Sequence, residues 1–245
     1  MTLSIRTVLC AAIALAGGTA AASGLQVAPV SLTIPPAHNA EGLWLSNTSD
    51  NVVHAQVRVY HWTQEGGTDK LTATHGLVIS PPMLQLDPSG QQLIRAIRLG
   101  APPSGANAAE DSYRVIIDEL PVDAQGKKGL QFVLRYSVPI FVEPIGALAR
   151  APQLAWTLRR EGENTILEVS NSGGTHAQVA DLSFTTATGH RIQVANGLLG
   201  YVLAGAQVHW VVKIPVEELT TGGTWEAMIN GTTAIQKIPL PTESH

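Results

Sequence analysis

The chain has 245 residues, a formal net charge of −4 and a single cysteine. So small a charge provides neither the basic field that attracts nucleic acid nor a polybasic patch for a lipid surface, so we expect no nucleic-acid partner. With one cysteine the protein can form no internal disulfide, and its stability must come from buried apolar surface.

The N-terminus is typical of a cleavable signal peptide, which we assign to residues 1–24. Arg6 precedes an apolar run from Val8 to Ala16, and a stretch of small residues follows. The run is too short to span a bilayer, which takes about 20 residues. We therefore expect cleavage between Ala20 and Leu25, no insertion into the membrane, and a periplasmic mature protein.

The remaining chain has the composition of a β protein. Short segments rich in Val, Ile, Thr and Leu alternate with turns that contain Gly and Pro, and no stretch keeps apolar residues at helical spacing. The clearest strand is Val52 to Trp62, in which every second residue from Val53 to Val59 is apolar. Further strands are predicted at Leu25 to Ile34, Gly42 to Ser46, Leu77 to Ser80, Leu84 to Leu86, Gln91 to Leu99, Tyr113 to Leu120 and Leu130 to Val142.

A break in the strand pattern divides the chain. Residues 143 to 152 contain two prolines and a glycine, which predicts a hinge between an N-terminal domain, residues 25–145, and a C-terminal domain, residues 152–241. Each has the size of an immunoglobulin-like sandwich, about 100 residues. The fold class is therefore predicted as all-β, with two immunoglobulin-like β-sandwich domains.

An internal echo accompanies this division. Leu45-Ser-Asn47 and His54-Ala-Gln-Val57 in the first half resemble Val169-Ser-Asn171 and His176-Ala-Gln-Val179 in the second. Shared strand composition explains the echo as well as duplication does.

The sequence contains no catalytic motif, and we expect no enzyme activity, no cofactor and no metal. No glycine-rich loop opens a helix, and no serine lies in a nucleophile elbow. Asp118 and Glu119 are neighbours on a predicted strand, so they face opposite ways and cannot share a site. Six histidines lie in separate strands and turns, without metal-ligand spacing: His54, His61, His75, His176, His190 and His209.

A periplasmic β-sandwich that binds a metal ion or a carbohydrate is the alternative. It would fit the signal peptide and the histidines, and its aromatic residues would gather at loop tips. The tryptophans instead fall within predicted strands, which favours packing: Trp44, Trp62, Trp156, Trp210 and Trp225.

The most unusual segment is a long apolar strand, Leu130 to Val142, after a polar loop at residues 121–129. Leu130, Phe132 and Leu134 occupy one face of this strand. Pro139 lacks a ladder donor and is typical of an edge or a bulge. When a soluble protein keeps a long apolar edge strand, a partner strand is the natural explanation.

Seven motifs follow one another in a specific order within residues 25–145. They are Ser46-Asn47, Ser80-Pro-Pro-Met83, Leu86-Asp-Pro-Ser-Gly90, Arg95-Ala-Ile-Arg98, Tyr113 to Asp118, Glu119-Leu-Pro121 and Leu134-Arg-Tyr-Ser-Val-Pro-Ile-Phe-Val142. This order resembles the periplasmic pilus-assembly chaperones of the chaperone-usher pathway.

The resemblance implies two sandwiches arranged as an L, with pilin subunits and an outer-membrane usher as partners. A pilin is an incomplete sandwich that lacks its final strand. Leu130, Phe132 and Leu134 would fill its groove until the extension of another subunit replaces them, which is donor-strand complementation.

The chain departs from the common members of that family. Those members hold the terminal carboxylate of the pilin with an Arg of the first strand and a Lys of the donor strand, positions that fall here near Ser31 and on Pro139. Glu143 stands where they carry an arginine that joins the domains. The chain therefore resembles the divergent, archaic-type branch.

Arg114 and Arg135 are the candidates for a replacement carboxylate anchor, since arginine presents a bidentate fork. A register that places the two opposite each other would create a site awaiting an anion. Alternatively, each pairs with Asp118, Glu119 or Glu143.

Overall fold

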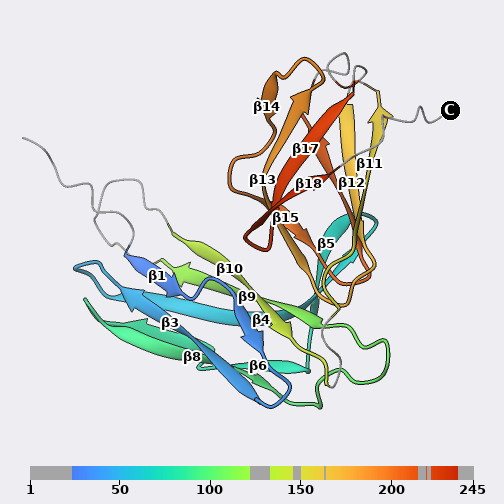
Figure 1. Ribbon diagram of the computed structural model, residues 1–245. Coiled ribbons are helices and arrows are strands. Elements are labelled where there is room, and N and C mark those ends of the chain that lie inside the picture. Colours follow the sequence, from blue (N-terminus) through green and yellow to red (C-terminus); the bar gives the residue numbers. More distant parts are fainter. Residues whose placement is uncertain are drawn as a thin grey trace, which may run out of the picture.

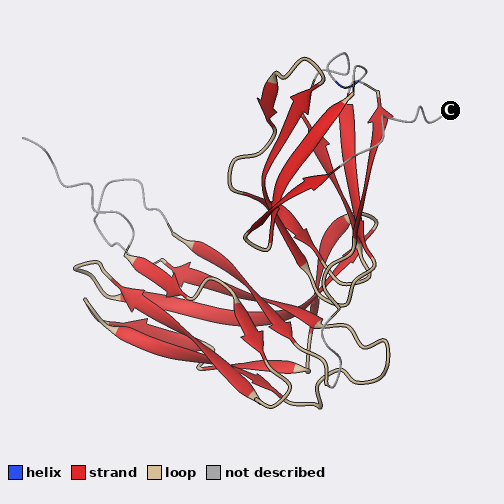
Figure 2. Cartoon of the chain, viewed as in Figure 1, coloured by secondary structure: helices blue, strands red, loops and turns tan. Residues whose placement is uncertain are grey.

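The computed structural model describes residues 24–121, 133–145, 150–162, 164–214, 219 and 222–236. Within them, four β-sheets form two sandwiches set at an angle to each other, as an L (Figure 1, Figure 2). The prediction of an all-β protein with two immunoglobulin-like sandwiches is confirmed. All strands of the first sandwich precede those of the second in the chain.

The first sandwich has ten strands in the described residues. They are β1 (Leu25–Ala28), β2 (Leu32–Ile34), β3 (Ala40–Asn47), β4 (Val53–Glu65), β5 (Thr68–Ala73), β6 (Leu77–Ser80), β7 (Met83–Leu86), β8 (Gln91–Arg98), β9 (Asp111–Leu120) and β10 (Arg135–Val142). One sheet has the order β1-β3-β8-β6, and the other has the order β2-β10-β9-β4-β5, with β7 also paired to β4.

The second sandwich is built in the same way from eight strands of the described residues. They are β11 (Leu154–Glu161), β12 (Asn164–Asn171), β13 (Ala177–Thr186), β14 (Arg191–Gln193), β15 (Leu198–Val202), β16 (Gln207–Val212), β17 (Gly223–Ile229) and β18 (Thr232–Gln236). One sheet has the order β11-β12-β16, and the other has the order β14-β13-β17-β18, with β15 also paired to β13.

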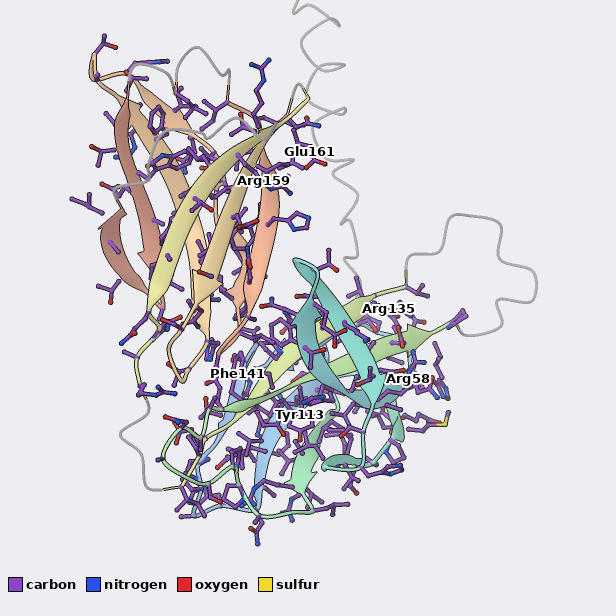
Figure 3. The ribbon with its side chains drawn as sticks, turned by 90° about the vertical axis from the view of Figure 1, so that its right-hand side faces the viewer. Arg58, Tyr113, Arg135, Phe141, Arg159 and Glu161 are labelled. Atoms are coloured by element: carbon purple, nitrogen blue, oxygen red, sulfur yellow. The ribbon has the colours of Figure 1, made fainter. Side chains whose placement is uncertain are left out.

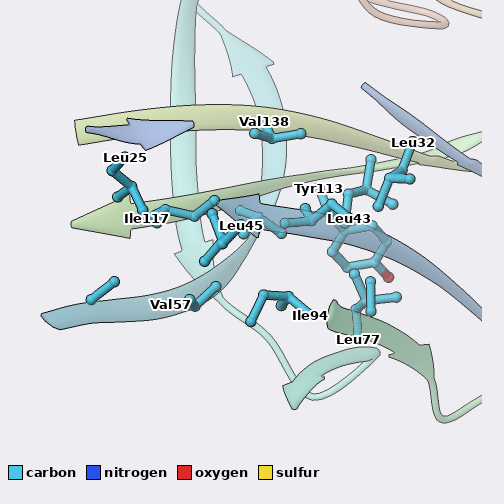
Figure 4. Close-up of a cluster of buried hydrophobic side chains, with 14 of the residues drawn as sticks. Leu25, Leu32, Leu43, Leu45, Val57, Leu77, Ile94, Tyr113, Ile117 and Val138 are labelled. Carbon is cyan, nitrogen blue, oxygen red and sulfur yellow. The ribbon is translucent and has the colours of Figure 1, made fainter. Parts of the chain in front are cut away.

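Alternating apolar residues close the first core, as the period-two pattern predicted. Val53, Ala55 and Val57 of β4 are buried, and they meet Leu43 and Leu45 from the opposite sheet (Figure 4). Removal of these side chains from water is the main favourable contribution to the free energy of folding.

All five tryptophans lie in strands, but they do not all pack in a core. Trp62, Trp156 and Trp225 are buried, whereas Trp210 is only half-buried. Trp44 is 48% exposed on β3. Trp210 on β16 packs against the second core, and Trp44 on β3 lies within a strand rather than in a turn.

The observed strands differ from the predicted ones in two places. The strand predicted over Leu25 to Ile34 is divided into β1 and β2, which belong to different sheets. β5 was not predicted, because its residues Thr68–Ala73 are exposed along their whole length and show no apolar alternation.

The internal echo corresponds to one structural feature that occurs in each sandwich. Asn47 at the end of β3 donates its side-chain amide to Asn51 O at 2.8 Å and accepts from Ser49 N at 3.0 Å. Asn171 at the end of β12 donates to Thr175 O at 2.8 Å and accepts from Gly173 N at 2.9 Å. Each amide also reaches a strand on the far side of the turn, Leu86 O for Asn47 and Val202 O for Asn171. In each sandwich, a buried asparagine therefore holds the turn that follows its strand.

The buried asparagines should contribute strongly to stability. Asn47→Ala leaves buried backbone groups without partners, so we expect a loss of about 1–3 kcal/mol in the free energy of unfolding, measured by urea denaturation. Asn171→Ala should have a similar effect on the second sandwich. Gln26→Ala, at an exposed position of β1, is the control and should change the free energy by less than about 0.5 kcal/mol. Equal effects of Asn47→Ala and Gln26→Ala would contradict this role.

Candidate functional site

β10 has two neighbouring strands over only part of its length. It pairs antiparallel with β9 from Arg135 to Val142, but it pairs with β2 only from Ile140 to Val142. Among the described residues, no strand pairs with 135–139 on the side away from β9. The first half of β10 therefore presents an open β edge.

The hydrogen-bond phase of β10 accounts for the proline in it. Glu119 N donates to Leu134 O at 2.9 Å, which makes these two residues a hydrogen-bonded pair. In an antiparallel ladder such pairs alternate, so Tyr136 and Val138 bond to β9 while residues 135, 137 and 139 direct their backbone groups to the other side. Pro139 therefore breaks no bond to β9.

The core-facing side chains of β10 form one row with Leu134. Val138, Ile140 and Val142 are buried, and Leu134 and Tyr136 pack against the same core. Leu134 is thus partly buried against its own sandwich. Leu130 and Phe132, the other two predicted donor residues, lie outside the described residues.

The expected pairing of the two candidate arginines is wrong. Arg135 lies opposite Asp118 on β9, and Arg114 lies opposite Pro139. The register differs by four residues from the one that would join the arginines, because Glu119 pairs with Leu134, which lies four residues later in the chain than a 121–129 loop suggests. Both arginines still lie on the outer face of the sheet, at different ends of β10.

Arg135 belongs to a three-residue charged cluster with Asp118 and Arg58 on adjacent strands (Figure 3). Both guanidinium groups donate to the Asp118 carboxylate. Partial desolvation acts to raise the pKa of Asp118, but the hydrogen bonds and charges of Arg135 and Arg58 outweigh it and hold that pKa below its usual range. The alternative in which Arg135 pairs with a neighbouring carboxylate is therefore the observed one.

Glu119 lies on the other face of β9 from Asp118, as predicted for neighbours on a strand. Its carboxylate accepts a hydrogen bond from Leu134 N at 3.2 Å. The two carboxylates serve different strand contacts and form no common site.

Arg114 lies where the two sandwiches meet. Its guanidinium carbon is 3.6 Å from the ring centroid of Trp62 and 5.1 Å from that of Tyr201, and its side chain is only 13% exposed. Its ion-pair partner is Asp69, whose Oδ2 lies 4.0 Å from Arg114 Nη2. Burial lowers the pKa of Arg114, while Asp69 and Tyr201 act in the opposite direction.

A cavity of about 370 Å³ opens beside Arg114 and is lined by both sandwiches. The first contributes Gln64, Gly67, Thr68, Asp69 and Arg114, and the second contributes Leu198 to Tyr201 and Val208 to Trp210. A buried guanidinium beside a cavity is suited to bind an anionic group such as a carboxylate.

Sequence reasoning missed a second contact between the sandwiches. Phe141 of β10 stacks on the imidazole of His176, with ring centroids 3.5 Å apart and planes within 5°. Glu110 accepts from His176 N at 2.6 Å and lies 2.8 Å from His176 Nδ1. Figure 3 shows Phe141 at the base of the second sandwich. The only sequence signal was the position of His176 within the internal echo, which carries no information about Glu110.

The described residues offer no support for a metal site. They contain no group of three or more His, Cys, Asp or Glu side chains that could hold a metal ion. His61 instead pairs with Asp111 at 2.8 Å, and His176 pairs with Glu110. The same part of the chain includes no helix long and apolar enough to cross a membrane.

Comparison with known proteins identifies one family and one fold. Residues 24–147 match the family described as pili and flagellar-assembly chaperone, PapD N-terminal domain. No curated protein matches the chain.

Several solved structures are similar over nearly the whole chain. One is a chaperone–tip adhesion subunit pre-assembly complex, CsuC–CsuE, from archaic Csu pili of Acinetobacter baumannii, with a TM-score of 0.68, 23% identity, and coverage of 90% of this chain and 99% of that chain. Another is the Pseudomonas aeruginosa CupB2 chaperone, with a TM-score of 0.59, 16% identity, and coverage of 87% and 100%. The E. coli chaperone DraB has a TM-score of 0.59, 16% identity, and coverage of 89% and 97%.

The charge of Asp118 should stabilise the sheet in a pH-dependent way. Because its pKa is lowered in the folded protein, its contribution is present above the unfolded pKa of about 3.9 and is lost as the pH falls through the folded value. Asp118→Asn should therefore be less stable than wild type at pH 7, and the difference should shrink toward pH 2 in urea unfolding. Asp50→Asn, at an exposed turn position, is the control. A difference that is the same at both pH values would contradict the effect.

Proposed function

The chain belongs to the family of pili and flagellar-assembly chaperones, and we propose that it captures pilin subunits in the periplasm by donor-strand complementation and delivers them to an outer-membrane usher. Its chemistry is strand pairing rather than catalysis, and it requires no cofactor. The N-terminal domain, residues 25–145, carries the donor strand, and residues 152–241 form the C-terminal domain.

The open first half of β10 is the observation that carries this proposal. Over residues 135–139 the backbone groups that face away from β9 have no partner strand among the described residues. A pilin is an incomplete sandwich that lacks one strand, so the strands beside the gap also have backbone groups without a partner. Pairing of the two satisfies backbone groups on both proteins.

The side chains of the donor strand would supply the specificity. If the strand continues toward the N-terminus, alternation would place Leu130 and Phe132 in line with the row that Leu134, Val138 and Ile140 form on the core-facing side of β10. The row would then leave the chaperone's own core and enter the groove of the pilin. Leu130 and Phe132 moved out of water would contribute on the order of 3 to 6 kcal/mol before ordering costs, and the already half-buried Leu134 would add less, which suits a stable but exchangeable complex.

The register of β9 and β10 supports Arg114 as the carboxylate anchor. Common members of the family carry the anchoring Lys at the position of Pro139, and Arg114 lies directly opposite Pro139 on the same face. In this chain the cation would therefore come from the neighbouring strand. A terminal carboxylate in the adjoining cavity would provide the bidentate partner that Asp69, at 4.0 Å, does not provide.

Arg135 is the weaker candidate. Its guanidinium is already bonded to Asp118, and its side chain is 68% exposed, so it would bind a carboxylate in competition with an internal partner and with water. Arg114 is enclosed, which makes a bound anion less screened.

Two similar structures are consistent with this proposal. One holds a chaperone with the tip adhesion subunit CsuE, and another holds the Salmonella enterica SafA pilin with the SafB chaperone. The alternative was a periplasmic protein that binds a metal ion or a carbohydrate, and its metal-binding form finds no group of three or more possible ligands among the described residues.

The donor role of Phe132 can be tested by charge. Phe132→Asp should abolish recovery of pilin with the chaperone from periplasm, because a carboxylate cannot enter an apolar groove without a large desolvation penalty. The readout is co-purification with the subunit identified by mass spectrometry, together with the melting temperature of the chaperone. Val133→Asp is the matched control, since Val133 is adjacent, 53% exposed and on the opposite face. A folded Phe132→Asp variant that still captures pilin would refute the donor assignment, and an unfolded variant would place Phe132 in the chaperone's own core.

The anchor role can be tested by exchanging each arginine for glutamate. Arg114→Glu should reduce pilin capture at least tenfold, because it places like charges together, whereas Arg135→Glu should reduce it much less. Arg114→Lys should retain part of the capture, since it keeps the charge and loses the fork. Thermal unfolding of each variant separates this effect from loss of the stacking on Trp62. If Arg114→Glu lowers the melting temperature and leaves capture by the folded fraction intact, Arg114 is a structural residue and not the anchor.

A further inference from the structure

The β4–β5 hairpin extends beyond the sheet to which it belongs. β4 pairs with β9 over residues 54–61 and with β5 over residues 60–65, so its residues 62–65 pair only with β5. We call residues 60–73 the brace hairpin. In Figure 1 it reaches the base of the second sandwich.

The brace hairpin is held by its own sandwich only at its base. There Tyr60 and His61 pair with β9, and Trp62 packs against Phe141. Every residue of β5 is exposed, and an isolated two-stranded hairpin is at best marginally stable in water. The far end of the hairpin is held instead by contacts with the second sandwich.

Gln64 makes the first of these contacts. Its Nε2 donates to Tyr201 O at 2.8 Å, and its Oε1 accepts from Leu203 N at 2.9 Å. A single side-chain amide thus bonds to the backbone of Tyr201 in β15 and of Leu203 directly after it. Asp69 accepts from the same Nε2 at 2.9 Å and keeps the side chain in place.

Gly67 makes the second contact, at the hairpin tip. It forms a parallel bridge with Val208, and its carbonyl accepts from His209 N at 3.3 Å. A Cβ at this position would overlap the imidazole ring of His209. The neighbouring Gly66 also has a positive φ, but a Cβ there meets nothing within 4 Å. Close approach to β16 thus requires glycine at 67 only.

A third contact, on a different strand, completes the attachment. Phe141 of β10 stacks on His176, and Phe141, Trp62, Tyr201 and Leu203 form one buried cluster between the sandwiches. Attachment at one point would leave the sandwiches free to rotate about it. Attachment through both the brace hairpin and β10 opposes that rotation.

We propose that the brace hairpin, through Gln64 and Gly67, sets the angle between the two sandwiches and so positions Arg114 against the walls of its cavity. The cavity beside Arg114 is lined by the hairpin on one side and by β15 and β16 on the other. A change in the angle would therefore separate the walls around the guanidinium. The effect on the angle stands alone, and the effect on pilin capture rests on the proposed function.

The test compares two neighbouring glycines in the full mature chain. Gly67→Ala and Gly66→Ala each place a side chain at a positive φ, which is 80° at Gly67 and 59° at Gly66, but only Gly67→Ala disturbs the contact with His209. Residual dipolar couplings report the relative orientation of the sandwiches. We expect a changed orientation for Gly67→Ala and the wild-type orientation for Gly66→Ala. Restoration of the orientation by Gly67→Ala with His209→Ala would identify the imidazole as the cause.

Gln64→Ala provides an independent variant. It removes the hydrogen bonds to Tyr201 O and Leu203 N, and it adds no atoms. It should also change the orientation, while the dipolar couplings within each sandwich remain those of wild type. An unchanged orientation in both Gln64→Ala and Gly67→Ala, or an equal change in Gly66→Ala, would overturn the proposal. The capture assay uses the pilin that co-purifies with the wild-type chain. If a variant changes the orientation but captures this pilin as well as wild type does, the positioning of Arg114 by the hairpin is refuted. Failure of the wild-type chain to capture any pilin would refute the proposed function and leave the orientation result intact.

Discussion

Every buried or half-buried backbone group in this structure needs a hydrogen-bond partner. In β10, the backbone groups on one side have such partners along the whole strand, and those on the other side have them only near its end. The strand has β9 along its full length and β2 along its last three paired residues. The alternation of hydrogen-bonded pairs directs the backbone groups of residues 135, 137 and 139 toward the open side. Pro139 occupies one of these outward positions, where its lack of an N–H leaves the ladder to β9 complete. One strand can therefore finish its own sandwich and still offer an edge to another protein.

The outer face of the same sheet changes in character from one end to the other. At the start of β10, Arg58, Asp118 and Arg135 form an exposed charged cluster. At its end, Phe141 lies among aromatic rings from both sandwiches, with the guanidinium of Arg114 nearby. Arg114 lies over the ring of Trp62, while Tyr201 is farther away and perpendicular to that ring. A guanidinium tolerates such enclosure because its planar, weakly hydrated group can stack on an aromatic face and remain charged. The junction thus combines apolar burial with a cation directed at a cavity.

Local sequence patterns were sufficient for most strands and insufficient for their register. Val53, Ala55 and Val57 identify β4 because its alternation reflects one buried face, whereas β5 has no buried face and so leaves no pattern. The arginines were assigned to the correct strands and the same face, but their opposition depended on where β10 begins, which the length of a polar loop does not determine. Glu110 and His176 lie 66 residues apart, and nothing in either segment indicates the other. The two turns held by Asn47 and Asn171, in contrast, were visible in the sequence as an internal echo. Their structural role became clear only from the hydrogen bonds of these two side chains.

The order of the strands has a consequence for how the chain folds when it emerges N-terminus first into the compartment where it folds. Because β1 to β10 all precede β11, the first sandwich can close its core before any strand of the second has emerged. At that stage Trp62 and Phe141 face solvent, since the residues that cover them, His176 and Tyr201, come later. A partly emerged chain thus exposes an apolar surface next to an open strand edge during this interval. Rapid emergence of residues 150 to 203 shortens the time in which two unfinished chains could associate through those surfaces.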